Sequence, residues 1–453
     1  MTSTTAGPPN RRAAIRSLQS GTIGAIVEWY EYTIYGTTAA LVFGTLFFPE
    51  LQAGIAQIAA LATFGVGFLA RPVGAFVAGH LGDRIGRKST LVLTFSVMTV
   101  ATALIGLLPT YGQIGLAAPI LLCVLRLAQG FAVGGEWGGA AIIAVENAPR
   151  GRRGFFGSWP QIGVSSGLLL GSGAIALAAA LSGDDFVVWG WRVPFLMSIP
   201  LAAVGFFIRL KASESPAFLE EKARQEAAHE EQKAPLVVLF REHRRPLLIA
   251  IFARFAEAGN YYIFTTFVLS YITVELGVPR QVGLVASMIG AAANIALIPV
   301  YGRLSDAIGR PRTFLIGGAC IIVTATPIFL LIETGQTWAI IVGIVLFMGL
   351  GHGLVYAPQP ALYCELFPTA VRYSGISVGY QMAAVLLSSF TPALASALLV
   401  WSGGAFWPII VFAIVTTGIA MVAVRFAPDR RSVPLDQIGL PVEKALAMKS
   451  SAV

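Results

Sequence analysis

Charged residues are scarce in this sequence of 453 residues. They make up 12% of the chain, whereas 56% of the residues are apolar, and a soluble domain normally carries about 25% charged residues. This scarcity excludes a chain of soluble domains and indicates a protein that crosses a membrane several times. Cysteine is also rare. Cys123, Cys320 and Cys364 all fall in apolar runs, which excludes a disulfide framework.

Several motifs of other protein classes are missing as well. The glycine-rich run from Gly82 to Lys88 lacks the spacing of a nucleotide-binding loop, so we do not expect ATP-driven transport by this chain alone. The net charge is +8, but no aromatic residues or nucleic-acid motifs accompany the basic residues, and we expect no nucleic acid to bind. We also expect no metal site, no bound cofactor and no cleavable signal peptide.

Long apolar runs, by contrast, fill most of the chain. An apolar helix needs about 20 residues to cross a bilayer, and twelve runs of suitable length are present. We therefore predict an all-α polytopic membrane protein with spans near 19–43, 55–80, 89–109, 115–145, 154–181, 190–210, 246–274, 281–301, 313–332, 337–366, 372–400 and 405–426.

The basic residues predict how the chain crosses the membrane. One set of connections carries Arg84, Arg87, Lys88, Arg150, Arg152, Arg153, Arg310, Arg312 and Arg372, whereas the opposite set carries only Arg280. By the positive-inside rule, the first set and both termini are cytoplasmic. The predicted parts are a cytoplasmic tail 1–18, a six-helix bundle 19–210, a cytoplasmic linker 211–245, a second bundle 246–427 and a cytoplasmic tail 428–453.

The two six-span halves repeat each other. Gly79-His-Leu-Gly-Asp83-Arg-Ile-Gly-Arg87 returns as Gly302-Arg-Leu-Ser-Asp306-Ala-Ile-Gly-Arg310, and Glu146 with Arg153 returns as Glu365 with Arg372. Because six is an even number, both halves have the same orientation. This parallel repeat is typical of secondary transporters that alternate access around a central site.

These motifs resemble the major facilitator superfamily, which the run at 79–88 and Arg126-Leu-Ala-Gln-Gly130 indicate. The runs Glu28-Trp-Tyr-Glu-Tyr32, Ala70-Arg-Pro-Val-Gly74 and Trp189-Gly-Trp-Arg-Val-Pro-Phe195 resemble its metabolite:proton symporter family. Members of that family carry shikimate, 2-oxoglutarate, citrate, dicarboxylates, or proline and betaine. The nearest resemblance is to shikimate transporters, on Arg254 with Glu257, His352 with Gln359, and Gln381. This chain has Glu31 where the family usually has aspartate.

The resemblance implies a transporter and not an enzyme. It implies a monomer in the plasma membrane that imports a small hydroxylated or carboxylated metabolite together with a proton. It also implies that Asp83, Arg87, Asp306 and Arg310 latch helices at the cytoplasmic side; the alternative is that these charges act only as a topology signal. An exporter on the same fold is the alternative, although the antiporter pattern is absent from 163–173. A distant alternative is an intramembrane serine protease that uses Ser165 with His352.

Matching polar stripes on the first span of each half mark a candidate central site. Glu28, Glu31 and Tyr35 share one helical face, and Arg254, Glu257 and Tyr261 share the equivalent face of span seven. If these faces meet, Arg254 binds a carboxylate through two hydrogen bonds while a nearby glutamate changes protonation. The alternative is a structural Arg254–Glu257 ion pair.

Spans four and ten add further candidates. Arg126 is expected to attract an anion. Glu136 is expected to carry the proton, because glycines around it admit a neighbouring helix that would desolvate it; the alternative is an ion pair with Arg71. His352, Tyr356 and Gln359 offer donors and acceptors for a hydroxylated substrate, unless they only bond helices together. A further series, Gly163, Gly167 and Gly171, predicts close helix packing.

Overall fold

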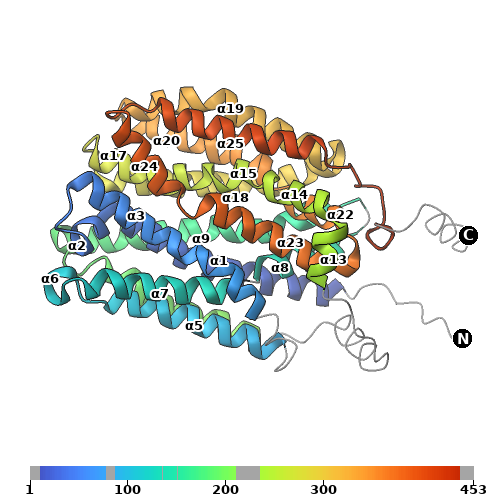
Figure 1. Ribbon diagram of the computed structural model, residues 1–453, viewed down its shortest axis with the longest axis horizontal. Coiled ribbons are helices and arrows are strands. Elements are labelled where there is room, and N and C mark those ends of the chain that lie inside the picture. Colours follow the sequence, from blue (N-terminus) through green and yellow to red (C-terminus); the bar gives the residue numbers. More distant parts are fainter. Residues whose placement is uncertain (1–10, 78–86, 135, 150, 211–234, 439–453) are drawn as a thin grey trace, which may run out of the picture.

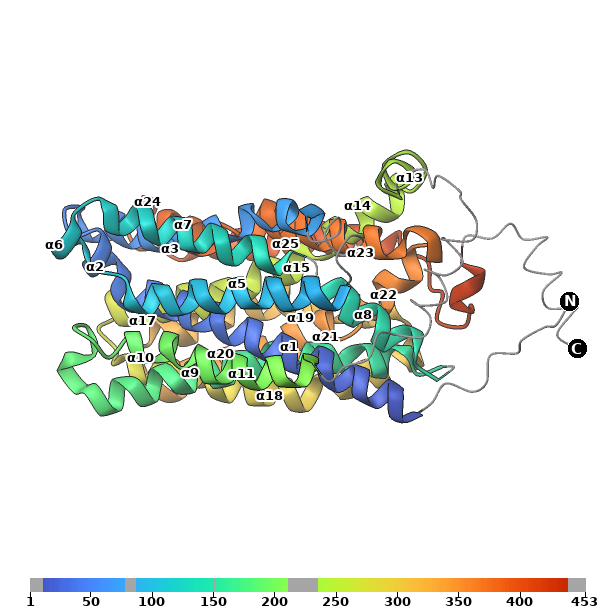
Figure 2. The same cartoon turned by 90° about the horizontal axis from the view of Figure 1, so that it is seen from below.

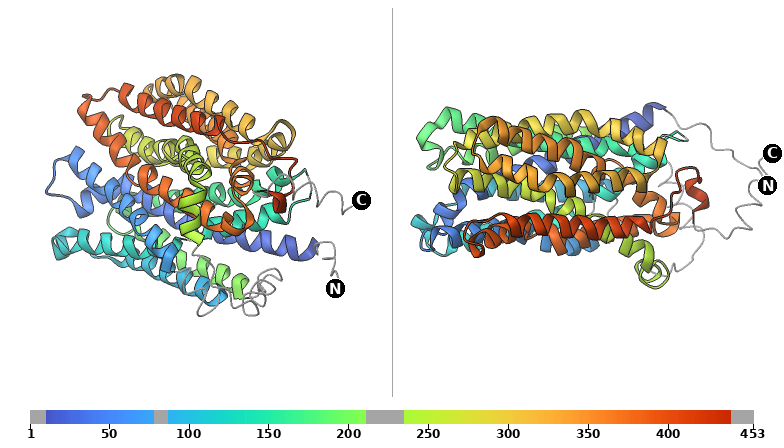
Figure 3. Two further views of the ribbon diagram at one scale, coloured as in Figure 1. Left: turned by 45° about the vertical axis from the view of Figure 1, so that its right-hand side comes forward. Right: turned by 90° about the horizontal axis from the view of Figure 1, so that it is seen from above.

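The structure is a computed structural model that describes residues 11–77, 87–134, 136–149, 151–210 and 235–438. Within these ranges the chain forms helices and no strands, and the helices run roughly along the long axis of the molecule (Figures 1 and 3).

The N half holds the elements up to Leu210. Apolar runs with few charged residues form its long helices. The elements are α1 Arg11–Thr38, η1 Ala39–Phe43, α2 Gly44–Phe47, α3 Ala53–Leu69, α5 Arg87–Leu107, α6 Tyr111–Ile114, α7 Ala117–Val133, α8 Glu136–Glu146, α9 Arg153–Ser182, η2 Gly183–Phe186, α10 Arg192–Leu196 and α11 Ser198–Leu210.

The C half repeats this order of helices. Its elements are α13 Pro235–Glu242, α14 Arg244–Ala253, α15 Phe255–Ala258, α16 Asn260–Tyr262, η3 Ile263–Phe267, α17 Val268–Val274, α18 Arg280–Ile308, α19 Arg310–Glu333, α20 Thr337–Leu346, η4 Phe347–His352, α21 Gly353–Tyr356, α22 Gln359–Leu366, α23 Thr369–Ala383, η5 Ala384–Ser388, α24 Thr391–Trp401, α25 Trp407–Arg425 and η6 Leu435–Gln437.

The helices account for the predicted spans in order. In the described part of the chain, nine helices are long and apolar enough to cross a membrane. Two shorter apolar helices, Val92–Leu107 and Arg192–Phe206, match spans three and six, and α1 with η1 and α2 matches span one. The twelve-helix architecture predicted from the sequence is therefore confirmed.

The two halves meet along α9 and α18, which pack against each other over much of their length, and α3 of the N half lies against α24 of the C half (Figures 1 and 2). The predicted glycine series lies where α9 meets α1. A Cβ atom added to Gly163 would lie 2.7 Å from the Ala25 Cβ, one on Gly167 would lie 2.6 Å from the Trp29 Cβ, and one on Gly171 would lie 2.8 Å from the Thr33 Cβ. The prediction of close packing is confirmed.

Two segments outside the predicted bundles also pack on the helices. In the predicted linker, Leu239 of α13 is fully buried and α13 packs on α23. The predicted C-terminal tail likewise packs back on the helices as far as Ile438, which is 4% exposed. Both segments have apolar side chains that helical packing can cover.

Candidate functional site

Arg254 is the centre of a buried polar cluster in the C half. Its Nε donates a hydrogen bond to Glu257 Oε2 at 3.0 Å, and its Nη1 donates to the carbonyl oxygen of Tyr380 at 2.5 Å. The guanidinium carbon lies 3.2 Å from the centre of the Tyr380 ring. The ion pair considered from the sequence is therefore present. It engages only one edge of the guanidinium, since Nη2 has no hydrogen-bond partner among the described residues.

Candidate residues of span ten lie beside span seven. The His352 ring centre is 5.0 Å from that of Tyr261 and 4.7 Å from that of Tyr356, and His352 Nδ1 lies 2.9 Å from the Asn294 amide nitrogen. The hydroxyls of Tyr261 and Tyr356, the amide of Gln359 and His352 Nε2 are buried without a hydrogen-bond partner in the described ranges. Sequence reasoning missed Asn294 because its pairing with His352 depends on helix packing.

Gln381 has a contact that the sequence did not suggest. Its Nε2 donates to the carbonyl oxygen of Gly134 at 3.0 Å, so this side chain connects α23 of the C half with the end of α7 in the N half. A Cβ atom at Gly134 would overlap the backbone of Arg71 and Ala75. The glycine thus admits the neighbouring helix, as its position beside Glu136 predicted. The side chain of Glu136 itself lies outside what the structure describes.

In the N half, Arg71 pairs with Glu28. Its Nη2 lies 3.9 Å from Glu28 Oε1, and its Nε donates to the Tyr32 hydroxyl at 3.3 Å. The guanidinium carbon lies 4.2 Å from the centre of the Phe68 ring. Sequence reasoning considered Arg71 only as a partner of Glu136. A pair between different helices cannot be read from spacing along one helix.

Glu31, Arg126 and Tyr35 form hydrogen bonds and ring contacts within the N half. The Thr102 hydroxyl donates to Glu31 and accepts from Gln129 Nε2 at 2.6 Å, and Gln129 Oε1 accepts from Arg126 Nη1 at 2.8 Å. Arg126 stacks on the Tyr35 ring, 3.9 Å from its centre. A continuous hydrogen-bond chain therefore links the Glu31 carboxylate to the Arg126 guanidinium.

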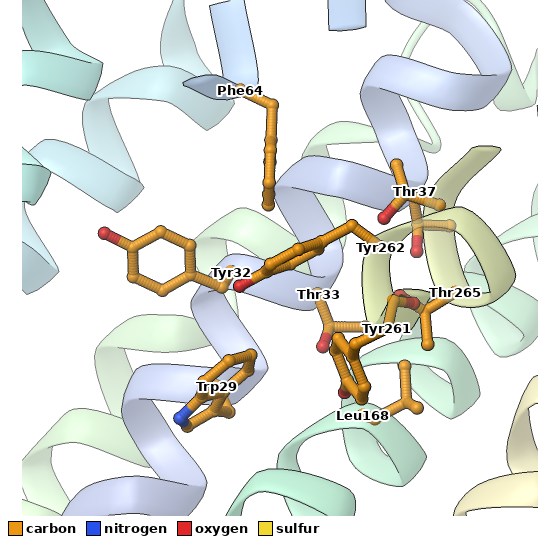
Figure 4. Close-up of a pocket in the computed structure, with 10 residues that line it drawn as sticks. Trp29, Tyr32, Thr33, Thr37, Phe64, Leu168, Tyr261, Tyr262 and Thr265 are labelled. Atoms are coloured by element: carbon orange, nitrogen blue, oxygen red, sulfur yellow. The ribbon is translucent and has the colours of Figure 1, made fainter. Parts of the chain in front are cut away.

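A small cavity lies between spans one and seven (Figure 4). It is lined from α1 by Trp29, Tyr32, Thr33 and Thr37 and from the C half by Tyr261, Tyr262, Thr265 and Thr266. The two repeat-related helices thus face each other, but the face of α1 that lines the cavity differs from the predicted one, which carries Glu31 and Tyr35. The cavity measures about 10 Å³, which is room for about one water molecule.

Ion pairs join the two halves at one end of the molecule, which we call the basic end and define by Arg153, Arg310 and Arg372. Asp306 accepts hydrogen bonds from the backbone nitrogens of Gly154 and Phe155, at 2.8 and 2.9 Å, at the N-terminus of α9, where the helix dipole favours an anion. Arg310 bonds both Asp306 and Glu365, at 2.8 and 3.1 Å. Of the other two predicted latch residues, Asp83 and the side chain of Arg87 lie outside the described residues.

The C-terminal segment covers the same basic end. Arg153 of the N half donates to the carbonyl oxygen of Val433 at 2.7 Å, and Arg372 of the C half donates to that of Leu435 at 2.8 Å. Arg372 also forms an ion pair with Glu146 of the N half at 2.7 Å. One backbone segment therefore contacts both halves where they meet.

The opposite end is also closed. Arg280 of the C half donates to the carbonyl oxygen of Gly183 in the N half at 3.0 Å and stacks on the Phe186 ring. In the described part of the chain the halves thus touch at both ends, and the cavity between spans one and seven is too small to hold a metabolite.

Two other chemistries find no support. Ser165 and His352 lie on α9 and η4, and no hydrogen bond joins them in the described structure, in which His352 Nδ1 instead contacts Asn294. The residues that the structure describes also hold no group of three or more His, Cys, Asp or Glu side chains that could bind a metal ion.

The comparisons with known proteins agree with the fold. The family model of the Major Facilitator Superfamily matches residues 21–380 and 250–450. The chain is 40% identical to the shikimate transporter of Escherichia coli (strain K12) over 395 residues, which cover 87% of this chain and 89% of that protein. It is 38% identical to the inner membrane metabolite transport protein YhjE of the same organism over 396 residues, 86% and 88% of the two chains.

Among solved structures, the proton:xylose symporter XylE bound to 6-bromo-6-deoxy-D-glucose superposes with a TM-score of 0.73 at 16% identity, over 96% of this chain and 99% of that one. At this identity the likeness concerns the fold. Together with the family model and the relatives, it shows that this chain is a multi-pass membrane transporter, not an enzyme, and that it belongs to the major facilitator superfamily.

Proposed function

We propose that this protein imports a small hydroxylated or carboxylated metabolite together with a proton, by alternating access across the plasma membrane. The class includes shikimate, 2-oxoglutarate and related organic acids. The observation that carries the proposal is the fully buried guanidinium of Arg254, whose Nη2 has no partner in the described structure. The C half also holds buried hydroxyl and amide groups without partners, those of Tyr261, Tyr356 and Gln359. The relative that transports shikimate supports the same class of substrate.

The energetics of the cluster favour an oxygen-rich anion. Leaving a buried polar atom without a hydrogen bond lowers the stability of the protein by about 1–3 kcal/mol. Leaving a buried cationic group without a partner lowers it by more. A carboxylate on Arg254 Nη2, with ligand hydroxyls near Tyr261, Tyr356 and Gln359, would satisfy these groups. His352 can take part through Nε2 if Nδ1 accepts from the Asn294 amide, which fixes the neutral tautomer.

Proton coupling rests on the buried carboxylates of span one. Glu28 is 6% and Glu31 is 1% exposed. When an anion enters nearby, burial and the like charge both favour the protonated, neutral form of such a carboxyl group. Glu136 remains a third candidate from the sequence. Since a monovalent anion and a proton together carry no net charge into the site, the pair can cross the low-dielectric interior more readily than the anion alone.

Gating rests on the basic end, which we take as cytoplasmic because of its excess of arginine. Asp306 and Arg310, and Asp83 and Arg87 by the repeat, would latch the halves and release them when the protein opens inward. The protein would act as a monomer with both termini in the cytoplasm.

Uptake of a labelled panel into energised membrane vesicles tests the proposal. The panel holds shikimate, 2-oxoglutarate, citrate, protocatechuate and betaine. Accumulation of one or more of the acids above the level of vesicles without the protein is the expected result. Accumulation of betaine alone, or substrate-driven efflux without uptake, would contradict the proposal.

A further inference from the structure

Arg71 of the N half is buried in the same way as Arg254 of the C half. The two side chains are 1% and 0% exposed, and each has an Nη2 atom without a hydrogen-bond partner among the described residues. Each also has one glutamate beside it, Glu28 and Glu257. Two buried guanidinium groups, one from each half, therefore each have an Nη2 atom that is available to a ligand.

A tyrosine of the C half lies in the surroundings of each guanidinium group. Arg254 stacks on the Tyr380 ring, and its guanidinium carbon lies 3.2 Å from the ring centre. The Tyr262 ring lies 5.7 Å from that of Phe68, on which Arg71 stacks. The Tyr262 and Tyr380 hydroxyls are buried and have no hydrogen-bond partner in the described structure. Four buried groups that can donate a hydrogen bond, Nη2 of each arginine and these two hydroxyls, thus have no acceptor in the described structure.

The two arginine–glutamate pairs differ in strength. Arg254 and Glu257 are hydrogen-bonded at 3.0 Å on one helical turn, so Glu257 holds the guanidinium in place. Arg71 and Glu28 come from different helices and approach only to 3.9 Å, which is beyond hydrogen-bond distance. Of the two glutamates, Glu28 is therefore the one that an incoming anion can replace more easily.

We propose that Arg71 is a second anion-binding residue, and that a substrate carboxylate takes the place of Glu28 on Arg71 as Glu28 accepts a proton. The inference rests on the proposed function and deepens it. The substrate is then a carboxylate with a second oxygen acceptor, a hydroxyl or another carboxylate, which reaches Arg254. The proton comes from water on the side to which the site is open, and it leaves with the substrate on the other side.

The charge balance of the site explains the coupling. Arg71, Arg254, Glu28 and Glu257 together carry no net charge, so an added carboxylate would leave one buried negative charge unless a glutamate is protonated. The groups near Glu28 on other elements include Arg71, at 3.9 Å, and Tyr380 of α23, and Glu28 has further contacts besides these; α8 also packs on α1 and carries Glu136. As the pH rises, Glu28 loses its proton and competes with the substrate for Arg71, so affinity should fall.

Binding and exchange by purified, reconstituted variants test the inference, with labelled shikimate and 2-oxoglutarate as probes. Arg71→Lys should bind the probe that wild type transports about tenfold to a hundredfold more weakly, because lysine lacks the planar two-bond contact. Arg425→Lys, at an exposed position on α25, is the matched control and should bind as wild type does. Glu28→Gln should keep counterflow exchange, lose uphill accumulation, and bind with an affinity that no longer falls as pH rises.

The outcomes separate the two proposals. Arg71→Lys with unchanged affinity, while Arg254→Lys loses binding, would overturn this inference and leave the proposed function in place. Uphill accumulation by Glu28→Gln would overturn it too. If Glu28→Gln does not fold, calorimetry on wild type in buffers of different ionisation enthalpy decides: binding without proton uptake would overturn it. Wild type that binds and transports neither acid would contradict the proposed function itself.

Discussion

Arg254→Lys should strongly weaken binding of a carboxylate substrate although it keeps the positive charge. The guanidinium already donates hydrogen bonds from Nε to Glu257 and from Nη1 to the Tyr380 carbonyl. Nη2 is therefore the nitrogen that remains available to a ligand. Lysine has one nitrogen for all three tasks. It would remain with Glu257, its nearest carboxylate, and the ligand would lose its charged hydrogen bonds.

The magnitude follows from the number of bonds lost. A hydrogen bond to a charged group is worth about 1.5–3 kcal/mol, which corresponds to roughly tenfold to a hundredfold in affinity. Calorimetric titration of purified protein at low and high salt measures the effect. The effect of Arg254→Lys should persist at high salt, because screening by ions acts mainly on exposed charges.

Arg126→Lys is the control for this experiment. Arg126 donates hydrogen bonds to Gln129 and to the Phe64 carbonyl inside the N half, at 2.8 and 2.9 Å. Arg126→Lys should therefore weaken substrate binding less than Arg254→Lys does. If Arg254→Lys binds like wild type while Arg126→Lys fails, the carboxylate site lies in the other half of the protein. If neither change matters, the substrate is not an anion, and the neutral or zwitterionic substrates of the family become the better guide.

Three further predictions concern packing and gating. Gly167→Leu should lower the folded yield and thermal stability of detergent-purified protein, since even a Cβ there would lie 2.6 Å from the Trp29 Cβ and overpacking costs about 1–3 kcal/mol; Gly112→Leu, at an open position, is the control, and equal stability of the two variants would refute the reasoning. Asp306→Asn should impair transport by vesicles more than binding, because it weakens the contact with the N-terminus of α9 far from the central site; an equal loss of affinity would argue against a gating role. Removal of the chain after Ala427 should raise the labelling by a maleimide of a Gly157→Cys variant in inside-out vesicles, because Gly157 of α9 is buried next to Pro360 of the C half and the removal takes away the Val433 and Leu435 contacts with both halves; labelling equal to that of the full chain would show that this segment does not hold the basic end closed.

Much of the fold could be predicted from the sequence because its signals are local. Apolar runs fixed the spans, and the repeat of the Asp83 and Asp306 motifs fixed their grouping into halves. The spacing of Gly163, Gly167 and Gly171 was enough to predict a close helix contact, since glycine at every fourth position lies on one helical face.

The site was harder to predict because it depends on how each helix is rotated and on pairs between helices. Spacing puts Glu28, Glu31 and Tyr35 on one face, but it does not say whether that face meets the cavity. In the structure Glu31 turns toward Thr102, while Trp29, Tyr32 and Thr33 line the cavity. The pairing of Arg71 with Glu28 and the return of the C-terminal segment to Arg153 are contacts between distant parts of the chain, for which the sequence carries no periodic signal.

The central claim is that a carboxylate metabolite crosses the membrane together with a proton. Uptake of labelled shikimate and 2-oxoglutarate into de-energised vesicles tests it most directly, with an imposed pH gradient, acid outside, and no sodium. The account predicts transient accumulation of at least one of the two acids above its external concentration, which a protonophore abolishes and added sodium does not change. Accumulation that requires sodium and is indifferent to the protonophore would contradict the claim.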